Sequence, residues 1–285
     1  MYRDDLLAGK KILITGGGSG LGKSIGRRYM ELGAELVICG RRTEVLEETA
    51  EEFRGETGGT IHTYGCDVRD AGAVDAMFDA IWAEGPLDGL VNNAAGNFIA
   101  RTEKLSPRAF DAVVDIVLRG SAYCMLNAGR RWIEAGRGGT ILSVSTVGAV
   151  QGRAFTVPSA AAKAGVLAMT RSLAVEWGPH GIRLNAVAPG YFPTPGAWER
   201  LFPKDAVSAP QEMQVPLRRL GEHIELANLF AYLMSDEAGY VNGEFISIDG
   251  GRSLQEGGGG DAVKPLFDWD EAQWDAFRNV GRAKK

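Results

Sequence analysis

Short apolar segments alternate with helical patterns along most of the chain, and this alternation constrains the fold more than any other feature. The apolar segments are rich in β-branched and aliphatic residues, and stretches of about ten or more residues with helical character separate them. Strands joined by such helices run parallel in a sheet that is covered on both faces. The expected strands are 11–17, 34–42, 60–68, 87–96, 139–148, 182–190 and 244–251. The pattern therefore predicts an α/β fold with a doubly wound parallel sheet.

The helical patterns and the absence of a linker in the sequence indicate one domain. No Pro- or Ser-rich stretch interrupts the alternation, so we expect a single domain over 1–256. Residues 190–222 contain five prolines and no clean period, which is typical of a lid inserted over a substrate site. The expected helices are 19–33, 43–58, 71–85, about 107–135 and 159–178.

Residues 257–285 form a tail that begins with the glycine-rich stretch "GGGGD". Four aromatic side chains follow, namely Phe267, Trp269, Trp274 and Phe277. So many aromatic residues are unusual in a free tail, and we expect this segment to dock on its own subunit or on a neighbouring one. The alternative is a frayed helix.

Charge and cysteine usage exclude several classes of protein. The net charge of −5 argues against a nucleic-acid surface, and no apolar run approaches the ~18 residues of a membrane span. The N-terminus reaches an apolar strand too early for a signal peptide. Cys39, Cys66 and Cys124 form no CxxC pair, which favours a reduced, cytoplasmic compartment. The three histidines have no metal-binding spacing, and we expect no metal.

The segment "TGGGSGLG" at 15–22 follows the first strand and opens a helix. Glycines allow a tight turn and a close approach of the backbone to a phosphate, and the positive end of the helix then faces that phosphate. Strand, turn and helix occur here in the order that a dinucleotide-binding site requires. The pyrophosphate contacts are assigned to Gly16, Gly18, Ser19, Gly20, Leu21 and Gly22. The alternative is a tight turn without a ligand.

The end of the second strand predicts which nicotinamide cofactor is bound. An acidic residue there would accept from the ribose 2′-hydroxyl of NAD and repel a 2′-phosphate. The chain instead carries Arg41 and Arg42, whose guanidinium groups pair with phosphate and favour NADP(H). The alternative is a pair of solvated arginines. Asp67, at the end of the third strand, is placed to accept from the adenine amino group.

With these motifs the chain resembles the short-chain dehydrogenase/reductase family. The resemblance covers residues 8–252 and includes "NNAAG" at 92–96, Lys163 on the helix after the fifth strand, and "PG" at 189–190. Within the family, "NNAAGNFIARTEKLSP", "VPSAAAKAGVLAMTRSLAVEWG" and "GAWERL" are similar to the 2,4-dienoyl-CoA reductase branch. The resemblance implies a Rossmann-type fold, NADPH, a homotetramer, and a fatty acyl-CoA substrate with conjugated double bonds.

The resemblance also implies roles for individual residues. Lys163 would hold the nicotinamide ribose, Asn97 would bind the thioester carbonyl, and Ser159 takes the place of the tyrosine found in most members. The substrate-binding residues would be Arg69, Phe98, Ser106 and Arg200, with Arg41, Arg69 and Arg200 meeting phosphates of the cofactor and of CoA. Further cofactor contacts would come from Val68, Asn93, Ala94, Gly96, Pro189 and Gly190.

Three positions depart from the patterns of the family. Gly148 stands where the mitochondrial-type branch has a tyrosine, fifteen residues before the lysine. The asparagine that most members carry in the helix after the fourth strand is matched here to Arg119. Peroxisomal-type relatives place an aspartate two residues beyond Asp115, and the residue here is Val117. None of the three patterns therefore supplies a proton donor.

The missing tyrosine favours reduction of a conjugated double bond over reduction of a carbonyl. A carbonyl becomes an alkoxide that requires a nearby acid, whereas a reduced enoyl thioester becomes an enolate that hydrogen-bond donors stabilise. Asn97 and Ser159 are the candidate donors, together with Lys163. Ser159 is alternatively an N-cap for the helix that follows it. Ser145 lies near the usual serine position of the family.

Two other functions remain open at this point. A carbonyl-reducing or alcohol-oxidising enzyme would need an unrecognised acid, for which Tyr191 in the lid is the candidate. A chain without the tyrosine and the helix asparagine would alternatively bind NADP(H) and acyl-CoA as a sensor or partner subunit. Asp115 is interpreted as a surface acid, and Arg119 as either an enolate-stabilising cation or a solvated side chain.

Overall fold

In a computed structural model, seven parallel strands form one sheet with the order β3-β2-β1-β4-β5-β6-β7. The structure describes residues 3–194, 211–256 and 269–280. The strands are β1 (Lys11–Thr15), β2 (Glu35–Gly40), β3 (Ile61–Gly65), β4 (Gly89–Asn92), β5 (Gly139–Val144), β6 (Ile182–Pro189) and β7 (Phe245–Ile248). The predicted doubly wound α/β fold is confirmed, and every expected strand is present.

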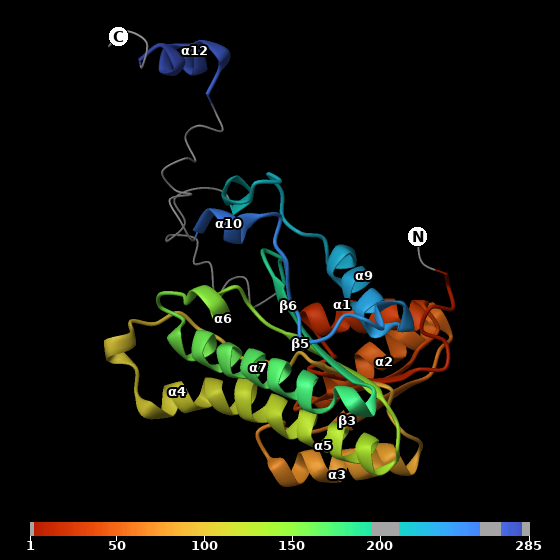
Figure 1. The fold of residues 1–285 in the computed structure, drawn as a ribbon. Coiled ribbons are helices and arrows are strands. Elements are labelled where there is room, and N and C mark those ends of the chain that lie inside the picture. The colour runs from red at the N-terminus through yellow and green to blue at the C-terminus, as the bar shows by residue number, and fades with distance from the viewer. Residues whose placement is uncertain (1–2, 195–210, 257–268, 281–285) are drawn as a thin grey trace.

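Two layers of helices cover the sheet, one on each face (Figure 1). One layer contains α1 (Gly20–Glu31), α2 (Thr43–Thr57) and α9 (His223–Met234). The other contains α3 (Ala71–Ala83), α4 (Pro107–Val114), α5 (Gly120–Glu134) and α7 (Val157–Glu176). Other helices are η1 (Thr102–Lys104), α6 (Gly148–Gln151), η3 (Gly178–His180), η5 (Gln211–Gln214), η6 (Asp236–Ala238), α10 (Arg252–Glu256) and α12 (Glu271–Val280).

Each helix layer has its own hydrophobic core against one face of the sheet. Beneath α1 and α9 the core contains Tyr29, Phe53 and Phe230. Beneath α3 and α5 it contains Phe78 and Trp132. The central strands β1, β2 and β4 are almost completely buried, as expected for a parallel sheet with both faces covered, whereas the edge strands β3 and β7 are only partly buried.

Strand order reverses between β1 and β4, and this reversal locates the site. β2 and β3 lie on one side of β1, whereas β4 to β7 extend on the other. Loops that leave the carboxyl ends of β1 and β4 therefore diverge and open a crevice. The expected strands run past the observed ones at this edge, because residues 16–17 and 93–96 leave the sheet there. Of these residues, Ala95 and Gly96 line the cavity that opens at the edge.

The long helix expected at about 107–135 contains a π-helical turn, η2 (Asp115–Arg119), between α4 and α5. A π-turn inserts a residue and rotates the side chains that follow it. The sequence pattern did not predict this turn, nor the helix α9 after the proposed lid. No helix in the described part of the chain is long and apolar enough to cross a membrane.

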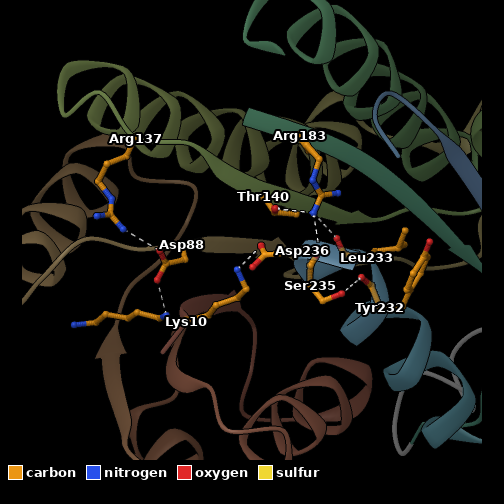
Figure 2. A network of polar contacts seen from close by, with 10 residues as sticks. Lys10, Asp88, Arg137, Thr140, Arg183, Tyr232, Leu233, Ser235 and Asp236 are labelled. Atoms are coloured by element: carbon orange, nitrogen blue, oxygen red, sulfur yellow. Dashed lines mark hydrogen bonds and ion pairs between the residues drawn. The ribbon is translucent and has the colours of Figure 1, made fainter. Parts of the chain in front are cut away.

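A polar network at the opposite edge of the sheet anchors the end of α9 (Figure 2). The Arg183 guanidinium donates to the carbonyls of Leu233 and Ser235, at 3.0 and 3.1 Å, and to the Thr140 hydroxyl. Its Nη1 donates to the Val241 carbonyl at 3.2 Å. Burial lowers the pKa of Arg183, because the charged guanidinium loses solvation. Its hydrogen bonds to the carbonyls and to the hydroxyl replace part of that lost solvation, so these contacts are structurally important.

Candidate active site

The first turn of the sheet is closed by contacts that only glycine allows. Gly16 has a φ of 67°, in the left-handed region. A Cβ at Gly22 would lie 2.7 Å from the Gly16 carbonyl oxygen, so a side chain there would open the turn. The Asn93 amide donates to the carbonyls of Thr15 and Gly16, at 2.9 and 3.1 Å. The loop after β4 therefore holds the glycine turn in place, and Ala94 lies against Gly16.

The start of α1 and the end of β2 fit a phosphorylated dinucleotide. Ser19 is the N-cap of α1, yet its side chain makes no capping hydrogen bond, so its hydroxyl and the first backbone N–H groups of α1 are available to a ligand. Arg41 and Arg42 are exposed after β2, and no ion pair involves either guanidinium among the described residues. Gly18 packs against α2, where its carbonyl accepts from Thr49 at 3.1 Å. These residues suit a pyrophosphate and a second phosphate on the ribose.

A cavity of about 540 Å³ lies at the carboxyl ends of β4, β5 and β6. Ser159 and Lys163 line it from α7, and Asn97, which is distant from them in the sequence, lines it from the loop after β4. Besides Lys163, four of the expected cofactor residues line the same space, namely Leu21, Gly96, Pro189 and Gly190. The cavity therefore joins the glycine turn to the residues expected to act on the substrate.

Lys163 is the buried cation of this cavity. Its ammonium donates a hydrogen bond to the Val144 carbonyl at the end of β5, and the side chain is almost completely buried. Burial lowers the pKa of Lys163 to about 8, because the charged form loses solvation. Lys163 is therefore a hydrogen-bond donor whose charge is sensitive to pH in the neutral range.

Ser159 is not the N-cap of a helix, contrary to the alternative raised from the sequence. Helix α7 begins at Val157, two residues earlier, and Thr156 is its N-cap. Pro158 fits the first turn of the helix, where no amide hydrogen is needed, so it starts the helix before Ser159 rather than after it. The Ser159 hydroxyl lies inside that first turn, one turn before Lys163, and faces the cavity.

Ser145 is a second hydroxyl in the cavity, directly after β5. Its Oγ is buried and has no hydrogen-bond partner among the described residues. A buried hydroxyl without a partner is costly, which indicates that a ligand completes its hydrogen bonding. Asn97 uses its Oδ1 to accept from the Phe98 amide at 2.9 Å, so its NH₂ group is the part that remains for a ligand.

Several residues expected to bind the substrate have other contacts in the structure. Ser106 caps α4 by accepting from the Ala109 amide at 3.2 Å. Phe98 packs on a small core with Val113 and Ala162. Neither side chain lines the cavity described above. The segment that contains Arg200 lies outside the described residues.

Asp67 and Arg69 form an ion pair with each other after β3. Two carboxylate–guanidinium contacts join them at 3.0 Å, and this pairing lowers the pKa of Asp67. An adenine contact from Asp67, or a phosphate contact from Arg69, would therefore compete with this pair. Val68 between them is buried against Gly120 of α5.

Arg119 lies outside the cavity, which removes the interpretation of it as an enolate-stabilising cation. Its guanidinium pairs with Asp115 one turn earlier at 3.0 Å, and the side chain is 63% exposed. The inward position of the π-turn is Val117, which is completely buried. The apolar residue at this position therefore takes no part in proton transfer.

Tyr191 lines the cavity, but its hydroxyl already has a partner. The hydroxyl lies 3.1 Å from Gln214 Oε1, and the Arg252 guanidinium stacks 4.1 Å from the centre of its ring. Arg153 and Arg252, two cations of the lining, were not identified from the sequence. Their signal is weak, because Arg153 lies in a short segment between α6 and α7 and Arg252 begins the short helix α10, and periodicity predicts the geometry of neither.

A doubly wound sheet with a glycine turn after β1 and a buried lysine one helix after β5 defines a short-chain dehydrogenase/reductase. The sequence profile described as Enoyl-(Acyl carrier protein) reductase matches residues 16–253, and the chain belongs to this family. It is an oxidoreductase of a family that uses NAD(P)(H).

The relatives include proteins named for dienoyl thioester reduction. The chain is 47% identical over 247 residues to the probable 2,4-dienoyl-CoA reductase [(2E)-enoyl-CoA-producing] of Bacillus subtilis strain 168, covering 86% of this chain and 97% of that protein. It is 43% identical over 291 residues to the probable 2,4-dienoyl-CoA reductase 3 [(3E)-enoyl-CoA-producing] of Caenorhabditis elegans, covering 100% and 93%.

A solved structure of the same fold contains a phosphorylated cofactor. The gluconate 5-dehydrogenase of Burkholderia cenocepacia J2315, in complex with NADP and tartrate, superposes with a TM-score of 0.82. It is 31% identical in sequence, and the match covers 88% of this chain and 98% of that chain.

Proposed function

We propose that this protein uses NADPH to reduce a conjugated carbon–carbon double bond in an acyl-CoA thioester of fatty acid metabolism. The observation that carries the proposal is the donor set of the cavity. Asn97, Ser145 and Ser159 are neutral donors around the buried Lys163. Gly148 stands where the mitochondrial-type branch has a tyrosine, so the phenol of that side chain is absent. Such donors suit an enolate oxygen better than an alkoxide.

The chemistry of the two reactions explains why the phenol can be absent. NADPH supplies a hydride when it is bound. An alkoxide must receive its proton on oxygen, and a serine hydroxyl is too weak an acid to deliver it efficiently. A thioester enolate is delocalised and takes its proton on carbon, from water, and loss of one donor to its oxygen costs about 3 kcal/mol. Asn97 and Ser159 would bind that oxygen, while Ser145 completes its own hydrogen bonding on the substrate or the nicotinamide amide.

The choice of NADPH rests on the end of β2. Arg41 and Arg42 are exposed there, and no carboxylate of the described residues pairs with them. A ribose 2′-phosphate would give both guanidinium groups an anionic partner. Lys163 would donate to the nicotinamide ribose, and the glycine turn would hold the pyrophosphate.

The substrate class rests on the relatives and on the residues expected at the acyl-CoA site. Proteins named 2,4-dienoyl-CoA reductase match nearly the whole chain. We assign Phe98, which follows Asn97 of the cavity wall, to the acyl side of the substrate and Arg69 and Arg200 to CoA phosphates, with Ser106 holding the start of α4. The position of the double bonds and the acyl length are left to experiment.

We further infer a cytoplasmic homotetramer in which α5 and α7 meet another subunit. Leu126 on α5 is 51% exposed and Val175 on α7 is 80% exposed, which is unfavourable in water. The tail at 257–285 would dock on the domain at 1–256 of its own subunit or of a neighbouring one. Within it Trp269 and Trp274 contact each other, with ring centres 5.1 Å apart.

Absorbance at the nicotinamide band tests the proposed function directly. The purified protein is mixed with NADPH, or with NADH, and either a 2,4-dienoyl-CoA or a simple ketone. The proposal expects turnover of the thioester with NADPH, much less with NADH, and negligible ketone reduction. Turnover of ketones alone would identify a carbonyl reductase, and binding without turnover would identify a sensor or partner subunit.

A further inference from the structure

The active-site cavity has a positive lining on a chain whose net charge is −5. Among the described lining residues, Arg153, Lys163 and Arg252 are cationic and Asp249 is the single carboxylate. The two carboxylate oxygens of Asp249 already accept hydrogen bonds from the amides of Gly251 and Ser253, at 3.0 and 2.8 Å. One carboxylate against three cations leaves the described lining with an excess of positive charge.

Two of the three cations have contacts that account for their positions. The Lys163 ammonium donates to the Val144 carbonyl and lies deep in the cavity. The Arg252 guanidinium stacks on the ring of Tyr191. Each of these side chains is thus held by the protein itself.

Arg153 differs from the other two cations. Its side chain lines the cavity and is exposed, and it forms no ion pair or hydrogen bond among the described residues. An unpaired guanidinium at the mouth of a site can bind an incoming anion without first breaking another contact.

The backbone around Arg153 is fixed, so its position at the mouth is part of the fold. Gln151, two residues earlier, donates through its Nε2 to the Ser253 carbonyl at 3.1 Å, which ties the end of α6 to α10. On the other side of Arg153, the Phe155 carbonyl accepts from the Ala100 amide at 2.9 Å. A Cβ added to Gly148 would lie 3.3 Å from the Cβ of Arg153, so the small residue at 148 leaves space beside this side chain.

We propose that Arg153 is a specificity-determining residue that binds an anionic group of the substrate at the mouth of the cavity. The group is either a phosphate of CoA or a carboxylate at the far end of the acyl chain, and both offer the paired oxygens that a guanidinium recognises. The assignment rests on the proposed function for the identity of the reacting bond. The positive cavity and the unpaired guanidinium support the anion itself.

Three thioesters distinguish the two sources of negative charge. The first is 2,4-hexadienoyl-CoA, which carries phosphates. The second is the N-acetylcysteamine thioester of the same acid, which is neutral. The third is the N-acetylcysteamine monothioester of muconic acid, a dienoyl chain that ends in a carboxylate. The variants are R153Q, R153K, and the control R3Q, whose side chain is 76% exposed beside Asp5.

The expected result is a selective loss of kcat/KM in R153Q. In R153Q the decrease in kcat/KM for one anionic substrate exceeds the decrease for the neutral thioester by about tenfold. The decrease comes from a higher KM, as expected for loss of one charge-assisted contact. Selective loss on the CoA thioester identifies a phosphate, and selective loss on the muconoyl thioester identifies a carboxylate. R153K retains part of the preference, and R3Q matches the wild type. Equal losses on all three substrates, or none, overturn the proposal.

A binding measurement separates this proposal from the proposed function. If the wild type reduces none of the three thioesters, the proposed function fails and Arg153 is tested by calorimetric titration with coenzyme A and with muconate. An affinity about tenfold weaker in R153Q than in wild type for either anion supports the assignment. Equal affinities for both anions overturn it.

Discussion

Lys163 on α7 donates a hydrogen bond to the backbone carbonyl of Val144, at the carboxyl end of β5. This contact fixes the lysine at the base of the cavity, where burial holds its pKa at about 8. The same short segment then leads to Ser145, whose buried hydroxyl has no partner among the described residues. The end of β5 therefore positions both a cation and a donor for ligands.

Replacing Lys163 by Met is expected to abolish turnover without unfolding the protein. The ordinary pKa of 10.5 falls to about 8 in the fold, so the charged form opposes folding. This cost is absent above pH 10.5, grows as the pH falls, and is complete below pH 8, at up to about 3 kcal/mol. K163M should therefore melt no lower than wild type at pH 7. Near-wild-type turnover would show that Lys163 does not contact the cofactor.

Binding of NADP(H) is expected to weaken as the pH rises through about 8. The protonated Lys163 has more hydrogen-bond donors than the neutral amine and attracts the phosphates, and deprotonation removes this advantage. The dissociation constant, measured by NADPH fluorescence, should be flat below pH 8 and rise up to tenfold per unit above it. K163M should bind NADPH weakly, and its dissociation constant should depend less on pH. If wild type and K163M showed the same pH dependence, Lys163 would not be its cause.

A tyrosine at position 148 is expected to increase the rate of dienoyl-CoA reduction. Gly148 lies in the cavity wall, and a Cβ there meets the Cβ of Arg153 at 3.3 Å, so a small shift admits a side chain. The new phenol would add one donor to the enolate oxygen, worth about tenfold or more in kcat. G148F fills the same space without the hydroxyl. If both variants lose substrate binding equally, the space beside Gly148 belongs to the substrate.

Replacing Arg183 by Leu is expected to lower the free energy of unfolding by about 3 kcal/mol. The substitution removes the guanidinium hydrogen bonds to the carbonyls of Leu233 and Ser235 (Figure 2). It also removes the one to the Val241 carbonyl, which keeps the Asn185 amide as a donor. Urea unfolding measures the loss. The matched control is Arg137→Leu, because Arg137 makes an exposed ion pair with Asp88 and should contribute within about 1 kcal/mol. Equal losses of unfolding free energy in both variants would show that the buried contacts of Arg183 stabilise the fold no more than an exposed ion pair does.

Much of the fold follows from patterns that are local in sequence. Alternating apolar and helical segments predict the parallel sheet. The glycine-rich segment predicts a turn between the strand before it and the helix after it. The end of a segment is less predictable, because residues 93–96 are apolar enough for a strand but leave it to contact the glycine turn. Helix α9 was missed because it follows a proline-rich stretch that hides its beginning.

The site was harder to predict wherever one residue had two possible partners. Ser159 after a proline looked like a helix cap, but the proline itself occupies the first turn and places Ser159 inside it. Arg119 looked free in the sequence, but a carboxylate one turn earlier holds it at the surface. Arg153 carries no local signal at all, because its importance comes from the cavity it lines.

The central claim is that hydride reaches carbon in a conjugated thioester, and isotope transfer measures this most directly. The protein is supplied with NADPH deuterated at the nicotinamide C4 and with 2,4-hexadienoyl-CoA, and the product is analysed by mass spectrometry and NMR. The account predicts one deuterium on a carbon of the acyl chain, with the thioester intact. Deuterium on a carbinol carbon, formed from a ketone or aldehyde substrate while the dienoyl thioester stays unlabelled, would contradict it.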